Sequence, residues 1–349
     1  MALPYAAEAR TRLGEALFAY LLGRPCDMDD DDTDANEAAL ARLRLVPRVM
    51  RGCAGIDIRT RLAGRAFSGP LAVGAFAGDR LFHEAGLLPV AQVCQHLDLP
   101  LFVSEETVTP LGDVTAAHDA CWLQIRACGP LDRARRMADL AVRHGARGLI
   151  LTVLAPAHLT PGAQPGGFDV GQGLARRGWS TIGSEGASGI AALPAFPHWR
   201  WNEVAALTAH LCGSGLSVFA KGILHPEDAA AAQAAGCHGV LAANIGLRQC
   251  GRWVAPAQVL AGLRGRVSGA LMLDGGVRHG VDAVVARCLG ADAAVATRPV
   301  AAALAADGGR AVAALLSGWL DEITSVTSWL GVSSLDELDR SFLHDGPGA

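Results

Sequence analysis

The sequence alternates short apolar runs with longer Ala-rich stretches of helical spacing, from about residue 70 to residue 297. Each run ends in small or polar residues, and eight runs occur, at 70–75, 101–103, 122–126, 148–153, 216–221, 239–244, 270–274 and 293–297. Strands that are apolar on both faces and alternate with helices are typical of a closed parallel (β/α)8 barrel. An open, doubly wound sheet is the alternative, but the G-x-G-x-x-G dinucleotide fingerprint after a first strand is absent. The rhythm therefore predicts an α/β protein with a TIM barrel.

Two segments depart from this rhythm. Residues 1–66 precede it, with helical spacing over 6–22 that ends at Gly23 and a second predicted helix over 35–43. The acidic run 29–32 between them lacks the ligand spacing of an EF-hand and predicts a solvated loop. Residues 161–197, after the fourth strand, are rich in Gly and Pro, and connections of this length are typical of active-site loops. We expect an N-terminal helical segment, 1–66, packed on a barrel of residues 67–349.

Bulk composition excludes several functions. The 349 residues are 51% hydrophobic, which is enough to bury a large core. The formal net charge of -4 gives no electrostatic reason to expect nucleic acid or an anionic membrane surface as a partner. Charged residues interrupt the N-terminal apolar stretch, and no uninterrupted apolar run approaches the ~20 residues of a membrane span. Nine cysteines without a Cys-x-x-Cys pair indicate reduced thiols, and no cluster has metal-ligand spacing. These features predict a cytoplasmic protein without a metal.

Polar residues stand at or just after seven of the eight predicted strands, and the carboxyl ends of the strands form the active face of such a barrel. They are Ser104, Gln124, Thr152, Lys221, Asn244, Asp274 and Arg298. The last two strands are followed by Asp274-Gly275-Gly276-Val277-Arg278 and by Thr297-Arg298, at the usual phosphate site of these barrels. Glycines there allow backbone N–H groups to approach a phosphate, and the arginines supply charge. A buried Lys221 requires an anionic partner. This end of the barrel is therefore predicted to bind an anionic ligand.

Further motifs extend the pattern over about residues 36–344. They are Val46-Pro47-Arg48, Leu151-Thr152-Val153, Ala220-Lys221-Gly222, Asn244-Ile245-Gly246-Leu247-Arg248-Gln249 and Arg298-Pro299. In order and spacing the sequence resembles the FMN-dependent 2-hydroxy-acid oxidases and dehydrogenases, such as glycolate oxidase, lactate oxidase and mandelate dehydrogenase. The resemblance implies a barrel that binds FMN and a small-molecule substrate, and a homo-oligomer, in this family usually a tetramer.

The resemblance also implies roles for three sets of residues. The flavin ring would be contacted by Ala75, Ser104, Gln124, Thr152 and Lys221, with Lys221 stabilising negative charge on the reduced ring. The phosphate would be held by Asp274, Gly275, Gly276, Arg278, Thr297 and Arg298, of which Thr297 stands where the family has Gly. Of the substrate-binding set, Tyr20 and Arg248 remain.

The catalytic positions differ from the family pattern. The family's base is a His that is replaced here by Ile245, and the Asp that orients this His is replaced by Leu154. An active-site Tyr is replaced by Arg126, and the position of a second substrate-binding Arg falls near Pro161. General-base assistance typically contributes about 10²–10⁴-fold to a rate, so ordinary oxidation of a 2-hydroxy acid should be severely impaired.

New polar residues accompany these losses. Glu106 occupies a position at which many family members have an aromatic residue. One hypothesis is that Glu106 and Arg126 face the flavin and, with Arg248, bind or protonate a different substrate. The alternative is that they form a structural salt bridge, or that Glu106 points to solvent. His158, in the loop after the fourth strand, is a candidate for a displaced base.

The leading functional prediction is an FMN-dependent oxidoreductase with an altered substrate, in specialised metabolism. An amine, an activated C–H compound or an anionic intermediate could each lose a hydride without a base at position 245. A non-redox or oxygen-inserting FMN enzyme is one alternative, and an FMN-binding pseudoenzyme that serves as a scaffold is another. The presence of Lys221, Gln124 and Thr152 favours a redox enzyme, because these residues would serve the flavin ring and not its phosphate.

Overall fold

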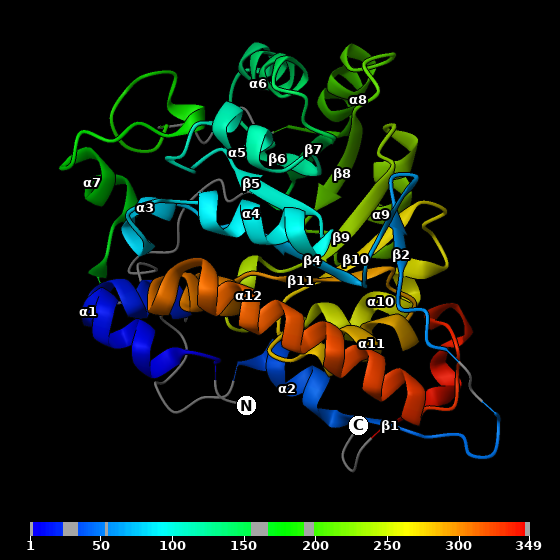
Figure 1. Ribbon diagram of the computed structural model, residues 1–349. Helices are drawn as coiled ribbons and strands as arrows, with labels where there is room; N and C mark the ends of the chain where they lie inside the picture. Colours follow the sequence, from blue (N-terminus) through cyan, green and yellow to red (C-terminus); the bar gives the residue numbers. More distant parts are fainter. Residues whose placement is uncertain (1–2, 24–33, 53–54, 155–166, 192–198, 346–349) are drawn as a thin grey trace.

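The computed structural model describes residues 3–23, 34–52, 55–154, 167–191 and 199–345. Its centre is a closed barrel of eight parallel strands (Figure 1). In chain order they are β4 (Leu71–Gly74), β5 (Leu101–Ser104), β6 (Cys121–Arg126), β7 (Gly148–Thr152), β8 (Ser217–Lys221), β9 (Gly239–Ala243), β10 (Ala270–Asp274) and β11 (Ala293–Ala296). β11 pairs with β4, which closes the ring. The barrel prediction is confirmed, and each predicted strand lies within one or two residues of an observed one.

Large aromatic side chains fill the lower part of the barrel interior. Trp122 stacks on Phe219 at a ring-centroid distance of 6.1 Å and meets the edge of Phe102 at 6.1 Å. Below them, Phe67 of the hairpin β2 (Thr60–Leu62) and β3 (Arg65–Phe67) lies 6.3 Å from the same indole. Because these rings stand near the beginnings of the strands, the interior is full at that end. Space for a ligand remains only towards the carboxyl ends.

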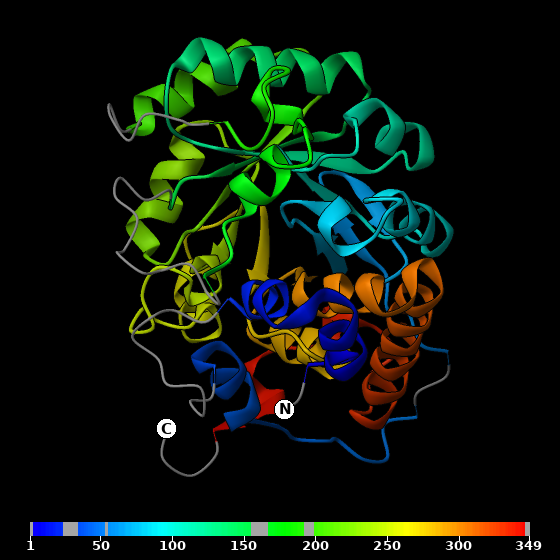
Figure 2. The same ribbon diagram turned by 90° about the vertical axis from the view of Figure 1, so that its left-hand side faces the viewer.

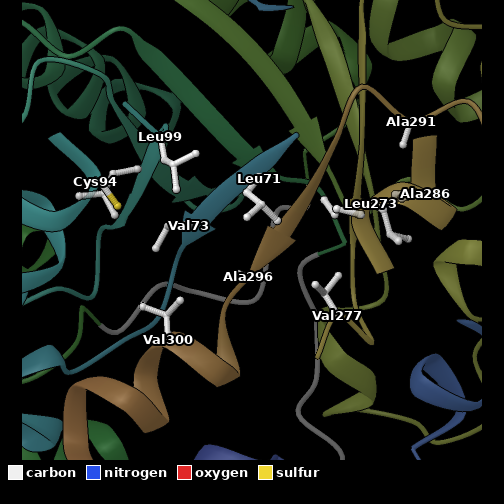
Figure 3. Close-up of a cluster of buried hydrophobic side chains, with 14 of the residues drawn as sticks. Leu71, Val73, Cys94, Leu99, Leu273, Val277, Ala286, Ala291, Ala296 and Val300 are labelled. Carbon is white, nitrogen blue, oxygen red and sulfur yellow. The ribbon is translucent and has the colours of Figure 1, made fainter. Parts of the chain in front are cut away.

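Helices surround the strands: α3 (Asp79–Phe82), α4 (Leu88–Leu97), α5 (Leu111–Ala117), α6 (Leu131–Arg143), α7 (Val170–Ala175), α8 (Trp201–His210), α9 (Pro226–Ala234), α10 (Pro256–Arg264), α11 (Gly280–Cys288) and α12 (Arg298–Trp329). Their apolar faces pack on the outward side chains of the strands. Figure 3 shows part of this layer, where Leu71 and Val73 of β4 lie near Cys94 of α4 and Val300 of α12. Many of the helical contacts are made by alanine, so helices and strands approach closely.

Helix α12 is the one described helix with the length and apolar composition to cross a membrane. Of its most apolar window, 67% is buried inside the protein, as in a core helix. The backbone departs from helical geometry at Asp307 and Gly308, and the helix packs against α1, α4 and α11. Its hydrophobicity is therefore accounted for by contacts within the fold.

The N-terminal segment begins with α1 (Ala6–Leu22), which ends at Gly23 in the left-handed conformation, as predicted. α2 (Ala35–Arg42) is capped by Asp34, whose carboxylate accepts from the backbone N–H groups of Asn36 and Glu37. β1 (Leu43–Leu45) then pairs with β12 (Leu343–Asp345), which brings the two ends of the described chain together. Figure 2 shows α1 and α2 on the side of the barrel covered by α11 and α12. The predicted domain boundary after residue 66 falls inside β3 and stays a prediction.

Part of the predicted active-site loop lies outside the described residues, which resume at 167–191. His158, Pro161 and the acidic run 29–32 also lie outside them. The described part of the loop carries α7 and a 3-10 turn (Ile182–Ser184). This turn is fixed to the loop after β5, because Ile182 N donates to Thr107 O at 2.9 Å and Gly183 N donates to Glu105 O at 2.7 Å.

Candidate flavin site

A cavity opens at the carboxyl ends of the strands, with an empty volume of about 1110 Å³ that includes its mouth. Every predicted site residue except Arg126 lines it: Tyr20, Ala75, Ser104, Glu106, Gln124, Thr152, Lys221, Arg248, Asp274, Gly275, Gly276, Arg278, Thr297 and Arg298. The walls between them are apolar and include Leu21, Phe76, Phe82 and Ile245. The closed barrel thus brings together residues that are up to 278 positions apart in the sequence, from Tyr20 to Arg298.

Asn244 is the exception among the strand-end residues. It does not line the cavity but is fully buried, and it exchanges two side-chain hydrogen bonds with Asn36, at 2.9 and 2.7 Å. Its amide also donates to Val254 O at 3.1 Å. The expectation that Asn244 faces the barrel mouth was therefore wrong. Its polar atoms are used to fix α2 to the loop after β9.

Lys221 is the buried cation at the centre of the site. Its Nζ lies 2.6 Å from Oδ2 of Asp274 and donates to Oε1 of Gln124 at 3.1 Å. Its side chain is only 9% exposed, so this carboxylate supplies the anionic partner that a buried ammonium needs. Beside it, Oγ1 of Thr152 is buried without a hydrogen-bond partner among the described residues. A ligand that accepts from the hydroxyl and the ammonium would complete this corner.

The opposite end of the cavity holds the two predicted phosphate arginines, and both are paired with carboxylates of the N-terminal segment. Nη2 of Arg278 lies 2.6 Å from Oε1 of Glu37, and Nη1 of Arg298 lies 2.8 Å from Oδ2 of Asp34. Sequence reasoning missed both carboxylates. The available signal was weak, because an Asp before a helix is explained as an N-cap alone.

The glycine pair Gly275-Gly276 lies close against α2. A Cβ atom on Gly276, whose φ is +84°, would meet the carbonyl oxygen of Asn36 at 2.5 Å. This contact requires glycine and brings the backbone of the turn into the cavity lining. Nε of Arg278 is buried there with no partner among the described residues. The turn and this N–H group form a cradle of donors suited to an anion.

Tyr20, Glu106 and Arg248 form the third corner of the cavity. The guanidinium of Arg248 lies 4.7 Å from the centre of the Tyr20 ring, and its Nη1 donates to Tyr20 O at 2.9 Å. Burial lowers the pKa of Arg248. Burial raises the pKa of Glu106, although the charges of Arg126 and Arg248 act in the opposite direction. A carboxylate and a guanidinium therefore share one water-poor corner.

Arg126 contacts Glu106 of this corner without lining the cavity itself. It does not line the cavity, because its Nε donates to Oε1 of Glu105 at 2.9 Å, while its Nη1 lies 3.4 Å from Glu106. Glu105 is 2% exposed and is shared with Arg133, which also donates to Gly183 O at 2.9 Å. The pKa of Arg126 is raised, since the attraction of Glu106 and Glu105 outweighs burial. Sequence reasoning missed Glu105 because its neighbour Glu106 was the residue aligned with the pocket.

Comparison with known proteins identifies the family. The model of the FMN-dependent dehydrogenase family matches residues 9–345. This chain belongs to that family. It is 30% identical to 4-hydroxymandelate oxidase of Amycolatopsis orientalis, with 88% of each chain covered, and 31% identical to an L-lactate oxidase of Alicycliphilus denitrificans, with 98% and 95% covered. Human 2-hydroxyacid oxidase 1 is 28% identical, with 98% and 96% covered. The crystal structure of mandelate oxidase with 3,3-difluoro-2-hydroxy-3-phenylpropionic acid superposes with a TM-score of 0.80 at 27% identity, over 98% of both chains.

FMN is the cofactor of the FMN-dependent dehydrogenases, and the cavity fits it. Thr152 Oγ1 and Arg278 Nε are buried donors without a partner among the described residues, and both residues line the same cavity. Lys221, Gln124 and Thr152 would hold the ring end, and the Gly275-Gly276 turn with Arg278 and Arg298 would hold the phosphate. Bound FMN supplies a two-electron acceptor for a hydride. The protein contributes the ammonium at the ring end, where negative charge on a reduced flavin would be stabilised.

The two residues predicted to replace the base and its orienting Asp, Ile245 and Leu154, are both apolar. Ile245 lines the cavity in the left-handed region, with a φ of +54°, and the next two residues continue there, with φ values of +61° and +62°. Leu154 follows β7 and packs closely on Gly222. A Cβ atom added to Gly222 would lie 2.5 Å from the Cβ of Leu154. Leu154 lines a second cavity of about 630 Å³ together with Trp199 and Trp201. Neither side chain can accept a proton.

Proposed function

We propose that this protein is an FMN-dependent oxidoreductase that removes a hydride from a small carboxylate substrate without a side-chain base at position 245. The observation that carries this proposal is that Ile245 lines a cavity that otherwise keeps the groups suited to FMN, while Leu154, at the other exchanged position, is apolar as well. The substrates named for the similar proteins are 2-hydroxy acids, whose hydroxyl proton must leave as the hydride does. The side chain of Ile245 cannot accept that proton. We therefore expect a substrate whose oxidation does not require a base at position 245.

The backbone conformation at Ile245 supports this proposal, because the loop is held in a conformation that does not suit isoleucine. β-Branched residues at positive φ are rare, and the left-handed region costs them roughly 1–2 kcal/mol. The conformation is held by its neighbours: Arg298 donates to Gly246 O at 2.6 Å, and Asn244 is fixed by Asn36. A loop with no remaining function would be free to lose these constraints. Their presence beside an apolar residue favours a changed chemistry over a decayed site.

The experiment is an absorption spectrum of the purified protein, followed by anaerobic addition of L-lactate, glycolate or mandelate. We expect a yellow protein whose flavin bands persist in all three acids and are lost on photoreduction. Photoreduction is the control that the flavin is bound and competent. Rapid bleaching by any of the three acids would refute the proposal. A colourless protein that does not take up added FMN would favour the scaffold alternative instead.

The homo-oligomer and the cytoplasmic location stay predictions, as does the place in specialised metabolism. Sedimentation of the purified protein at two concentrations tests the first of them.

A further inference from the structure

Two charged groups of the cavity keep hydrogen-bonding capacity for a ligand. The other charged side chains lining it are matched within the described protein: Lys221 with Asp274, Arg278 with Glu37, and Arg298 with Asp34. At the corner formed by Tyr20, Glu106 and Arg248, the charged groups are not fully paired with each other. The Arg248 guanidinium donates one hydrogen bond, to a backbone carbonyl, and has no carboxylate within 4.0 Å among the described residues. This guanidinium therefore suits an incoming carboxylate.

Glu106 is the complementary group. Among the described residues its one ion-pair contact is Nη1 of Arg126 at 3.4 Å, whereas the shorter bond of that arginine, at 2.9 Å, goes to Glu105. Arg133 binds the second oxygen of Glu105, so the two arginines and Glu105 form a closed cluster behind the cavity wall. Glu106 is left facing the cavity, with 24% of its side chain exposed. A half-buried carboxylate in this position suits a cation or a strong N–H donor.

We propose that the substrate of this site is an amine that bears a carboxylate, of the α-amino-acid type, with Arg248 and Tyr20 taking the carboxylate and Glu106 the nitrogen. This inference rests on the proposed function and specifies its substrate class. The apolar walls Phe76, Phe82 and Leu21 favour a hydrophobic side chain on the same molecule. A hydroxy acid offers the carboxylate but gives Glu106 no cation beyond the 3.4 Å contact with Arg126.

The chemistry accounts for the missing base. An ammonium group loses its proton at a pKa of about 8–10, whereas an alcohol is about as weak an acid as water, whose pKa lies far above that range. A carboxylate is a far better match for the first than for the second. Glu106 takes one proton from the ammonium, and the neutral amine remains. Bound FMN would then accept the hydrogen of the α-C–H bond with its electron pair, while the nitrogen lone pair forms a C=N bond. Water hydrolyses the resulting iminium to a keto acid and ammonium.

The test compares three probes that share a phenyl ring. Phenylglycine and mandelate differ in the amine or hydroxyl on the α-carbon, and benzylamine lacks the carboxylate of phenylglycine. FMN-loaded protein is mixed with each under anaerobic conditions, and binding is measured by the initial shift of the flavin absorption bands, before any reduction bleaches them. We expect phenylglycine to bind at least about tenfold more tightly than mandelate or benzylamine, since each lacks one charge-assisted contact.

Variants separate the two contacts. Glu106→Gln should bring phenylglycine and mandelate to within about threefold of each other, and Glu106→Asp should retain the preference. Arg248→Lys should weaken both acids by about tenfold and leave benzylamine unchanged, because lysine does not reproduce the bidentate geometry. Fluorescence quenching of added FMN checks that each variant still loads. Glu15→Gln, an exposed carboxylate paired with Arg10, is the charge-matched control.

Two results would overturn the inference: mandelate binding as tightly as phenylglycine, or a preference that persists in Glu106→Gln. If mandelate instead bleaches the flavin rapidly, the proposed function itself has failed. If neither acid is preferred and mandelate leaves the flavin oxidised, the substrate class alone is wrong.

Discussion

Nη1 of Arg298 and Oδ2 of Asp34 lie 2.8 Å apart, across the end of the cavity where the FMN phosphate would enter. A phosphate dianion that approaches this guanidinium is attracted by the arginine and repelled by the carboxylate. The pair is mostly buried, with side-chain exposures of 13% and 16%, so solvent screens this competition only in part.

Asp34→Asn should therefore tighten FMN binding by about 3- to 30-fold, as expected for a partly buried charge. Asparagine caps a helix as well as aspartate, so α2 should keep its N-terminus and the charge alone changes. The measurement is the dissociation constant of FMN from the apoprotein, by fluorescence quenching. Asp132→Asn, at an exposed pair with Arg135, is the control. Weaker binding in the Asp34 variant would mean that the carboxylate orients the arginine instead of competing with the phosphate.

Lys221→Met should destabilise the protein by about 3–5 kcal/mol, because Asp274 is left as a buried carboxylate without its cation. Lys221→Met combined with Asp274→Asn should recover most of that loss. Urea unfolding of the apoproteins measures both. A double variant no more stable than the single one would show that the ammonium acts through packing and not through this pair.

Glu106→Gln should gain stability relative to the wild type as the pH rises. Burial raises the pKa of Glu106 above that of a carboxyl group in water, so the folded protein holds this proton more tightly than the unfolded chain does. The stabilising contribution is complete below the unfolded pKa and is lost as the pH passes the folded pKa. Urea midpoints at pH 4, 5, 6, 7 and 8 should show a difference that grows upward from about pH 4.5. A constant difference would contradict this account.

Ile245→Asn should leave stability unchanged or raise it by up to about 1 kcal/mol, because asparagine tolerates the left-handed conformation that isoleucine does not. The comparison is Ile223→Asn, at a fully buried position, which should cost several kcal/mol. Chemical denaturation of both variants is sufficient. A loss above about 1 kcal/mol at position 245 would show that the apolar contacts of Ile245 outweigh its backbone strain.

Ile245→His combined with Leu154→Asp should restore reduction of the flavin by mandelate or lactate, by about 10²–10⁴-fold over the parent. Ile245→His alone should restore less, because the imidazole lacks its orienting carboxylate. Anaerobic stopped-flow absorbance measures the rates, with Ile245→His plus Leu154→Asn as the matched control. Equal rates in the aspartate and asparagine variants would show that a carboxylate at position 154 does not orient or charge-balance the imidazole at position 245.

The sequence was sufficient for the barrel, because a two-faced apolar strand followed by a helix is a local pattern repeated eight times. The sequence also predicted most of the residues that line the cavity, because the carboxyl ends of all eight strands of a closed barrel lie around the same opening. The sequence did not predict which of two possible partners a side chain contacts. Asn244 hydrogen-bonds to Asn36, and Arg126 hydrogen-bonds to Glu105 and does not line the cavity. Asp34 and Glu37 were invisible as partners of the arginines, because nothing local in the sequence indicates how α2 seats against a turn more than 230 residues away.

The pairing of β1 with β12 has a consequence for how the chain is made. Leu43 can pair with Asp345 only after about 300 further residues have been synthesised. Contacts of such large sequence separation form slowly, because a long loop must close before they contribute. The contacts of the α2 segment with Asn244, the Gly275-Gly276 turn and Arg298 also join residues more than 200 positions apart, so the phosphate end of the cavity is completed late in folding.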